Sequence, residues 1–316
     1  MITHLNASEE RPARVIVLGA SGFVGADAVR RLNEAGMTTL GLASADVDLC
    51  AAGAVEALRG RVRHDDVMVI VSALTPDRGK DIGTFMRNVT MGAHLSAFLE
   101  QAACSHVVYI SSDAVYGEPS SLIREETPCR PDSRHGLMHV VREQLLTQAV
   151  AARTPLLILR PGPLYGPGDP HQSYGPNRFI RTALAEGLIR LFGGGEERRD
   201  HVYVEDLSRL IAQCVLRRSV GCLNVATGQS VSFASVAGLV ARLCDGPVRI
   251  EPSPRQAAAT HRFFEVSARL KAFPAFRHTP LDEGLAKTFQ GCAGSHGNAA
   301  GAVMAEAEQP TRGGAA

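Results

Sequence analysis

The chain has 316 residues, of which 45% are hydrophobic and 21% charged, a balance that fits one large globular domain or two closely packed lobes. Its net charge of +1 excludes the basic surface of a nucleic-acid-binding protein. Every apolar run is shorter than the roughly 18 residues of a membrane span. The seven cysteines form no Cys-x-x-Cys pair, as in a reduced cytoplasmic protein. We therefore expect a cytoplasmic protein that acts on a small molecule, without nucleic acid or membrane.

The clearest motif comes near the start of the chain. Residues 14–18 are a β-branched apolar run that leads into glycines at 19, 22 and 25, and an amphipathic helix follows. Gly19 permits a tight turn, Gly22 lets the backbone approach a pyrophosphate, and Gly25 lets the helix pack close to the strand. The first N–H groups of the helix then face the phosphates. This order of strand, glycine turn and helix predicts a dinucleotide site.

The choice between NAD and NADP is commonly made at the end of the second strand, which we expect over residues 38–42. Ala43 and Ser44 stand at this place, where an acidic side chain would hold the adenosine ribose. Because neither residue is a carboxylate, a 2′-phosphate is not excluded, although no arginine stands there either. The sequence therefore favours NADPH over NADH.

Strands and helices alternate through the first half of the chain. Further buried strands are expected over 65–76, 106–117 and 154–168, with a long helix over 134–152. This alternation predicts an α/β fold with a Rossmann-type, doubly wound parallel sheet, whose ligands bind at the carboxyl ends of the strands.

The pattern divides the chain into four regions. Residues 13–166 are expected to form the dinucleotide-binding domain, to which later segments return. Residues 167–290 are expected to form mainly a smaller C-terminal α/β lobe that binds the substrate. Residues 1–12 and the Gly/Ala-rich residues 291–316 have little to bury and are predicted to be disordered.

Four motifs occur in a characteristic order: GASGFVG at 19–25, YISSDAVYG at 109–117, LRPGPLYGPG at 159–168 and RRDHVYVEDL at 198–207. Together they resemble the NAD-dependent epimerase/dehydratase-like branch of the extended short-chain dehydrogenase/reductase superfamily. The resemblance implies a nicotinamide cofactor. The cofactor contacts that it implies are Gly19, Ser21, Gly22, Phe23 and Val24 at the pyrophosphate, Asp48 and Leu49 at the adenine, Ala73 and Leu74 along the ribose and diphosphate, and Pro161, Gly162 and Leu164 beside the nicotinamide.

The resemblance also implies a substrate site at the boundary of the two lobes. Arg199 falls where relatives hold a substrate diphosphate, although an arginine in this charged loop can equally be an ordinary surface residue. The other substrate contacts that it implies are Leu74, Ser112, His135 and Leu164.

One feature of this family is missing. Its chemistry rests on a Ser or Thr together with a Tyr and a Lys, the last two spaced Tyr-x-x-x-Lys on one helix. Ser112 is present in the expected place. Alignment on Glu143, however, puts His135 at the tyrosine position and His139 at the lysine position, which also contacts the cofactor in relatives.

The two histidines can replace the missing pair only in part. Their spacing of four residues puts both rings on one face of the helix, where each opposes a proton on the other. We therefore expect neutral rings at pH 7, which donate hydrogen bonds but are weak acids. The alternative is that they are tolerated remnants of a lost catalytic pair. His-x-x-x-His is also a metal-ligand spacing, but the sequence fixes no third ligand, and no metal is predicted.

The candidate catalytic residues are thus Ser112, Asp113, His135 and His139. The dehydratases carry a glutamate where this chain has Ala114, which disfavours dehydration. Reduction of a ketone requires only a hydride, a polarising donor and one proton from water, histidine or substrate.

This profile is similar to atypical ketoreductases of antibiotic biosynthesis, such as the angucyclinone ketoreductases of the simocyclinone type. We therefore predict an NAD(P)H-dependent ketoreductase whose small-molecule ketone substrate is hydroxylated, such as an aromatic polyketide, and supplies the proton itself. A nucleotide-sugar epimerase or 4-ketoreductase is the alternative enzyme, and a non-catalytic NAD(P)H-binding sensor is an alternative of another class. By resemblance alone, a homodimer would pair through the helices near His94 and His139.

Overall fold

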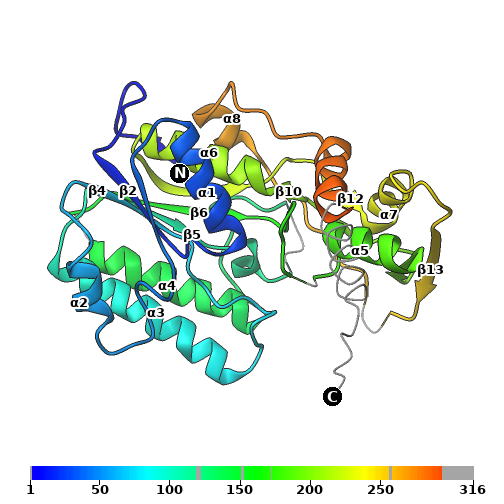
Figure 1. The fold of residues 1–316 in the computed structure, drawn as a ribbon, viewed down its shortest axis with the longest axis horizontal. Helices are drawn as coiled ribbons and strands as arrows, with labels where there is room; N and C mark the ends of the chain where they lie inside the picture. The colour runs from blue at the N-terminus through cyan, green and yellow to red at the C-terminus, as the bar shows by residue number, and fades with distance from the viewer. Residues whose placement is uncertain (1, 119–121, 151–152, 172, 256–257, 294–316) are drawn as a thin grey trace, which may run out of the picture.

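The chain is built around a seven-stranded sheet with the strand order β1-β11-β6-β5-β4-β2-β3. Figure 1 shows this computed structural model, which describes residues 2–118, 122–150, 153–171, 173–255 and 258–293. All neighbouring strands are parallel except β1 with β11, which confirms the predicted Rossmann-type α/β sheet. The strands are β1 (Thr3–His4), β2 (Arg14–Leu18), β3 (Thr39–Leu42), β4 (Asp66–Ile70), β5 (His106–Ile110), β6 (Leu156–Pro161) and β11 (Ser219–Val225).

The order of these strands determines where a ligand can bind. From β2 the chain passes to β3 on one side and then crosses to β4 on the other side. The loops that follow β2 and β4 therefore diverge and leave a crevice at the carboxyl ends of the strands. Open α/β sheets bind their ligands at such a switch point.

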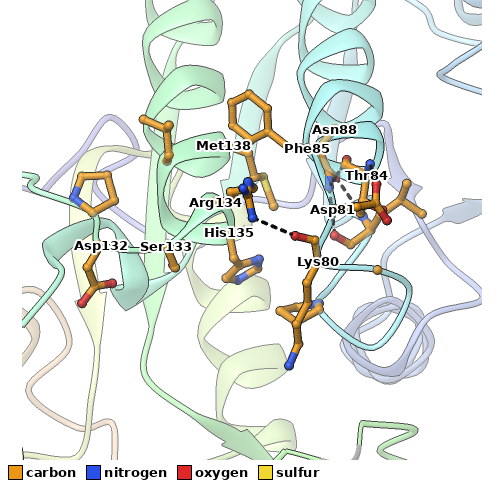
Figure 2. Close-up of a pocket in the computed structure, with 15 residues that line it drawn as sticks. Lys80, Asp81, Thr84, Phe85, Asn88, Asp132, Ser133, Arg134, His135 and Met138 are labelled. Atoms are coloured by element: carbon orange, nitrogen blue, oxygen red, sulfur yellow. Dashed lines mark hydrogen bonds between the residues drawn. The ribbon is translucent and has the colours of Figure 1, made fainter. Parts of the chain in front are cut away.

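Three helices cover one face of the sheet (Figure 1). Alternate strand residues such as Ile16 and Met68 face these helices, because successive side chains of a strand point to opposite faces. The first turns of α3 and α4 border a cavity that Figure 2 shows from close by. The helices are α2 (Ala54–Arg59), α3 (Ile82–Gln101) and α4 (Arg134–Val150).

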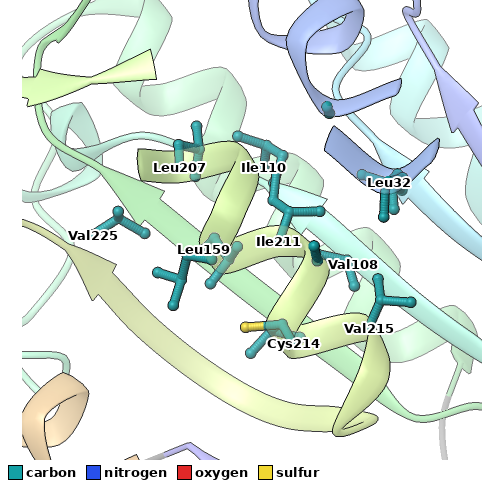
Figure 3. Packing of buried hydrophobic residues seen from close by; sticks show 14 of the residues in the cluster. Leu32, Val108, Ile110, Leu159, Leu207, Ile211, Cys214, Val215 and Val225 are labelled. Carbon is teal, nitrogen blue, oxygen red and sulfur yellow. The ribbon is translucent and has the colours of Figure 1, made fainter. Parts of the chain in front are cut away.

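The opposite face of the sheet packs against α1 (Phe23–Glu34) and α6 (Val204–Leu216). Figure 3 shows Leu207 and Ile211 of α6 beside Val108 and Ile110 of β5. These fully or almost fully buried aliphatic side chains fix the sheet on which the site is built.

The remaining elements form a smaller lobe at one end of the sheet (Figure 1). Its core is aromatic, with Phe179 and Phe233 packed near Tyr165 and Tyr203. Three two-stranded pairs, β10–β7, β12–β9 and β13–β8, complete it. The elements are β7 (Leu164–Tyr165), α5 (Pro176–Glu186), β8 (Leu188–Phe192), β9 (Arg198–Arg199), β10 (Val202–Tyr203), β12 (Val231–Ser232), α7 (Phe233–Ala241) and β13 (Arg249–Ser253).

Two chain segments differ from the prediction of disordered ends. Thr3 and His4 form β1, and the His4 ring bonds Ser219 Oγ at 2.8 Å and the Ala272 carbonyl at 3.0 Å. The sequence missed this edge strand because it is only two residues long. At the other end a helix spans 281–293, three residues into the predicted tail, and residues 294–316 lie outside the described part of the chain.

The last stretch before that helix returns to the large sheet. Helix α8 (Ser267–Ala272) places Ala268 and Ala272 against the core shared by the sheet and α6, and Phe273 and Phe276 are buried there. In the described ranges, no helix has the length and hydropathy to cross a membrane.

Candidate active site

The three motif glycines have different roles in the turn between β2 and α1. Gly19 adopts φ +89°, and a Cβ on it would lie 2.8 Å from Ser72 N, while a Cβ on Gly25 would lie 2.0 Å from Gly19 O. These two glycines are therefore required by the fold itself. A Cβ on Gly22 would meet only Gly19 O, at 3.4 Å, so the space in front of Gly22 is open. Gly22 is also the N-cap of α1, and the open space is where a pyrophosphate fits.

A cavity of about 360 Å³ extends from this turn along the ends of β2, β3 and β4. It lies over the switch point, where open α/β sheets bind their ligands, and the glycine turn forms part of its wall. It is lined by most of the residues predicted to bind the cofactor: Gly19, Ser21, Gly22, Phe23, Val24, Ala43, Ser44, Asp48, Leu49, Ala73 and Leu74.

Four of the predicted cofactor residues do not line this cavity. Pro161 is the last residue of β6, and Gly162 N donates to Val225 O at 3.0 Å. Leu164 pairs with Val202 between β7 and β10. The fourth, His139, is buried within α4.

A carboxylate does stand near the turn that follows β3. Asp46 Oδ2 accepts a hydrogen bond from Ala43 N at 2.9 Å, which brings the Asp46 side chain back to the Ala43–Ser44 turn. The sequence alone shows only Ala43 and Ser44 at the end of the strand and does not reveal that the Asp46 side chain folds back to them. Negative charge at this turn opposes a 2′-phosphate, so the geometry does not support the predicted preference for NADPH.

Asn88 of α3 fixes the loop after β4. Its Oδ1 accepts from Leu74 N at 2.8 Å and its Nδ2 donates to Leu74 O at 2.9 Å. Leu74 lines both the dinucleotide cavity and the larger cavity beside it. Asn88 therefore holds the residue at which the two cavities meet.

The larger cavity has a volume of about 810 Å³ and lies between the first turns of α3 and α4. Figure 2 shows His135 and Met138 of α4 with Phe85 of α3 around it. Burial, together with a smaller effect of His171, lowers the pKa of His135 to about 4. His135 is therefore a neutral imidazole at pH 7.

The structure brings the two predicted histidines together. The rings of His135 and His139 meet edge to face with their centroids 4.8 Å apart. His139 is buried, and its Nδ1 lies 2.7 Å from the hydroxyl of Tyr109 in β5. Burial first, and then His135 and Arg142, lower the pKa of His139 well below its usual value. Both rings are thus neutral, as the sequence led us to expect.

Ser112 and Asp113 lie where β5 ends and the 3₁₀ turn η1 (Asp113–Tyr116) begins. Ser112 Oγ accepts from Ala114 N at 3.1 Å and keeps its own hydrogen for donation. Asp113 is buried, and its Oδ2 receives Arg262 Nη1 at 2.9 Å. Asp113 therefore anchors Arg262 from the smaller lobe, a contact that the sequence did not predict, and is not a free base.

Arg199 also has partners within the smaller lobe. Its Nη2 donates to Glu197 Oε1 at 2.7 Å and its Nη1 to Thr260 O at 2.8 Å. Its Nη2 also lies 3.8 Å from Oε1 of Glu118, which follows η1 beyond the end of β5. Arg199 thus reaches the lobe boundary but lines none of the cavities described above.

Neither of the tyrosines that could replace the missing phenol is free. The Tyr116 hydroxyl donates to Asn224 Oδ1 at 2.7 Å and accepts from Arg160 Nη1 at 2.9 Å. Tyr165 is packed in the aromatic core of the smaller lobe. Burial raises the pKa of both phenols. Within the described residues, no three His, Cys, Asp or Glu side chains are grouped to hold a metal ion.

Comparison with known proteins agrees with this geometry. Residues 15–225 match the model of the NAD dependent epimerase/dehydratase family. The chain is 28% identical over 313 residues to a dTDP-4-dehydro-6-deoxy-D-allose reductase of a Streptomyces species, covering 87% of this chain and 94% of that protein.

Two solved structures share the fold. The UDP-glucose 4-epimerase of Thermus thermophilus, in complex with NAD, has a TM-score of 0.78 and 23% identity, and the match covers 89% of this chain and 99% of that one. An epimerase of Methanothermobacter thermautotrophicus has a TM-score of 0.80 and 18% identity, over 91% of this chain and 94% of that one. The chain belongs to the NAD-dependent epimerase/dehydratase family, in the extended branch of the short-chain dehydrogenase/reductases.

Proposed function

We propose that the protein reduces the ketone of a nucleotide-activated 4-keto sugar to an alcohol, using a nicotinamide dinucleotide as the hydride donor. The observation that carries this proposal is that His135 and His139, which the resemblance puts at the family's acid–base pair, lie with their ring centroids 4.8 Å apart and have pKa values lowered by burial. Epimerisation through a keto intermediate needs a base that removes a proton and an acid that returns it. Ketone reduction needs only a donor beside the carbonyl, which the site offers.

The substrate class is proposed from the relatives and from the smaller lobe. A reductase that by its name acts on a dTDP-4-dehydro-6-deoxy sugar matches along 94% of its own length. The aromatic polyketide that the sequence led us to expect has no such support. Arg199 and Arg262 place two guanidinium groups near the end of β5, and we assign Arg199 to the substrate diphosphate.

Three residues of this chain have defined tasks in the reaction. A reduced nicotinamide, when bound, supplies the hydride that forms the new C–H bond. Ser112 has an O–H that is free to donate to the carbonyl oxygen. His135 offers a second donor as a neutral imidazole, which polarises a carbonyl without first carrying a charge. The ring of His139 packs edge to face against the ring of His135 and so supports it. The alkoxide then takes its proton from solvent or from a neighbouring hydroxyl of the substrate.

The choice of cofactor follows from the turn after β3. Asp46 returns to Ala43, and we therefore propose that NADH is used at least as well as the NADPH that the sequence favours. The Thermus epimerase, which was solved with NAD, supports a cofactor of this type. Comparing kcat/KM for the two reduced cofactors tests this choice.

A second candidate substrate is a hydroxylated aromatic ketone. It is favoured by the larger cavity beside His135, where Leu74, Phe85 and Met138 offer apolar surface. A panel of dTDP-4-keto sugars and aryl ketones separates the two candidates, with oxidation of NADH and NADPH as the readout. Turnover of aryl ketones alone would overturn the sugar proposal, and tight cofactor binding without turnover would indicate a sensor.

We also propose a homodimer that pairs through α3 and α4. Ile82 and Met86 at the start of α3 are 63% and 51% exposed, and Leu137 of α4 is 44% exposed, which leaves an apolar area on these helices. Light scattering of the purified protein would give twice the chain mass if this area is an interface. A monomer at all concentrations would contradict it.

A further inference from the structure

The hydrogen bond between Tyr109 and His139 fixes where the proton of His139 lies. The Tyr109 hydroxyl is 2.7 Å from His139 Nδ1, and among the described residues it has no other hydrogen-bond partner. Burial raises the pKa of Tyr109 to about 12, so the phenol is protonated at pH 7. If Nδ1 carried the hydrogen, the phenolic hydrogen would be buried without an acceptor, which destabilises the structure. The phenol therefore donates to Nδ1, and the ring hydrogen of neutral His139 is on Nε2.

The environment of Nε2 differs from that of Nδ1. Among the described residues Nε2 has no partner, and it does not belong to the nitrogen atoms that are shut off from solvent. His139 is also in edge contact with His135, which lines the larger cavity. The Tyr109 hydrogen bond thus leaves the N–H donor of His139 on Nε2, which has no partner among the described residues.

Arg142, one turn further along α4, adds a buried positive charge behind this pair. It is 0% exposed, and its Nη1 donates to Ser72 O at 2.8 Å, while Nε and Nη2 have no partner among the described residues. Its guanidinium carbon lies 5.2 Å from the centre of the Tyr109 ring. Gly92 of α3 makes room for it, since a Cβ on Gly92 would lie 2.8 Å from Arg142 Cγ. A buried cation without a carboxylate destabilises a fold, so its presence points to a purpose other than stability.

The charges around His139 act in one direction. Among the described residues, His135 and Arg142 of α4 act electrostatically on its ring, and both oppose its protonation. Tyr109 of β5 stays neutral, and the nearby carboxylate Glu143 is neutralised by Arg160 at 2.6 Å. Arg142 therefore adds to burial and His135 in opposing a proton on His139.

We infer that Tyr109 and Arg142 are positioning residues that keep His139 neutral with its hydrogen on Nε2, as a donor to a hydroxyl of the cofactor ribose. The resemblance puts His139 where relatives carry lysine, and we assign to its neutral N–H a hydrogen bond that a cationic side chain would otherwise make. The inference rests on the proposed use of this crevice for a nicotinamide dinucleotide.

Nitrogen-15 NMR of the histidine rings in the full-length protein tests the tautomer directly, with the His139 signals assigned by their loss in His139→Gln. We expect the hydrogen on Nε2 in the unaltered protein and a mixture of tautomers in Tyr109→Phe. Tyr116→Phe is the matched control, because it also removes a buried phenol but does not touch His139. A hydrogen on Nδ1 in the unaltered protein would overturn the inference, and this holds even if Tyr109→Phe fails to fold.

The role of Arg142 is tested by charge. In Arg142→Met we expect the pKa of His139 to rise, although burial and His135 still hold it below its usual value. In Arg142→Lys, which restores the charge, the pKa of His139 should stay as low as in the unaltered protein. If His139 titrates equally in the Met and Lys variants, the charge of Arg142 has no effect on the protonation of His139.

Cofactor affinity connects the tautomer to function. We expect Tyr109→Phe to weaken NADH binding about tenfold, which corresponds to about 1.4 kcal/mol, while Tyr116→Phe leaves it unchanged. NADH binding is measured without any ketone, so a wrong substrate assignment does not affect the outcome. If the tautomer is as expected but Tyr109→Phe binds NADH normally, the positioning role is refuted. If NADH does not bind the unaltered protein at all, the proposed function fails instead.

Discussion

Two buried arginines, Arg142 of α4 and Arg160 of β6, each lie over a tyrosine ring but differ in their hydrogen-bond partners. Arg160 forms an ion pair with Glu143 at 2.6 Å and also bonds the Tyr116 hydroxyl. Arg142 meets no carboxylate among the described residues and leaves two of its nitrogens without a partner there. The first cluster is complete within the protein, so we regard it as structural. The second is incomplete and lies next to the candidate site, where an uncompensated charge has a use.

The largest expected difference between the two clusters is in stability. Arg160→Met leaves the Glu143 carboxylate buried without its partner and should lower the free energy of unfolding by about 3–5 kcal/mol. Arg142→Met removes an unpaired buried charge and should change it by less than about 1 kcal/mol, or raise it. Urea unfolding of both variants measures the difference. Equal losses would mean that Arg142 is structural too.

The same distinction between structural and functional parts divides the glycine motif. Gly22→Val puts a side chain into open space and should weaken NADH binding more than about 100-fold, or about 2.7 kcal/mol, with little loss of stability. Gly25→Ala is the matched control, because its Cβ would press on Gly19 O and destabilise the fold. Titration calorimetry and thermal unfolding separate the two effects. Normal NADH binding by Gly22→Val would show that the cofactor binds elsewhere.

A smaller effect is expected at His135. As a neutral donor it should contribute about tenfold to kcat/KM, so His135→Phe should cost about 1.4 kcal/mol of transition-state stabilisation. The pH profile should be flat with respect to His135 above about pH 5, since its pKa is about 4. A loss of several thousandfold in steady-state kinetics would instead identify His135 as the acid of the reaction.

The smallest effect concerns buried histidines outside the two clusters. Burial lowers the pKa of His106 to about 4 and of His201 to about 3. In the unfolded chain both titrate near 6.5, so stability falls as the pH drops from about 6.5 towards 4, by about 1 kcal/mol for each at about pH 5.8. Thermal unfolding of the unaltered protein and of His106→Gln between pH 7 and 5 measures this. An identical pH dependence in the variant would show that His106 is not responsible.

Much of the molecule could be predicted from local patterns. The sheet, the glycine turn and many of the residues that line the candidate cofactor cavity follow from alternating strands and helices and from the motif at 19–25. The pairing of His135 with His139 follows from helical spacing. These features depend on residues that are close together in the sequence.

The missed features depend on contacts between distant segments. Asp113 forms an ion pair with Arg262, which lies 149 residues later in the sequence, and no local pattern predicts this pair. The hydrogen bond between Tyr109 and His139 joins a strand to a helix. The motif YISSDAVYG contains the tyrosine but does not indicate its partner. Asp46 was missed because a turn, and not the strand end itself, brings its carboxylate back to Ala43.

The central claim is that a retained dinucleotide crevice and neutral imidazoles make a ketone reductase. The most direct test is to incubate the protein with NADH carrying deuterium on the transferable position and a dTDP-4-keto-6-deoxy sugar. The account predicts an alcohol with one deuterium on the former carbonyl carbon. An epimerised ketone without deuterium, or cofactor that stays unoxidised with every ketone offered, would contradict it.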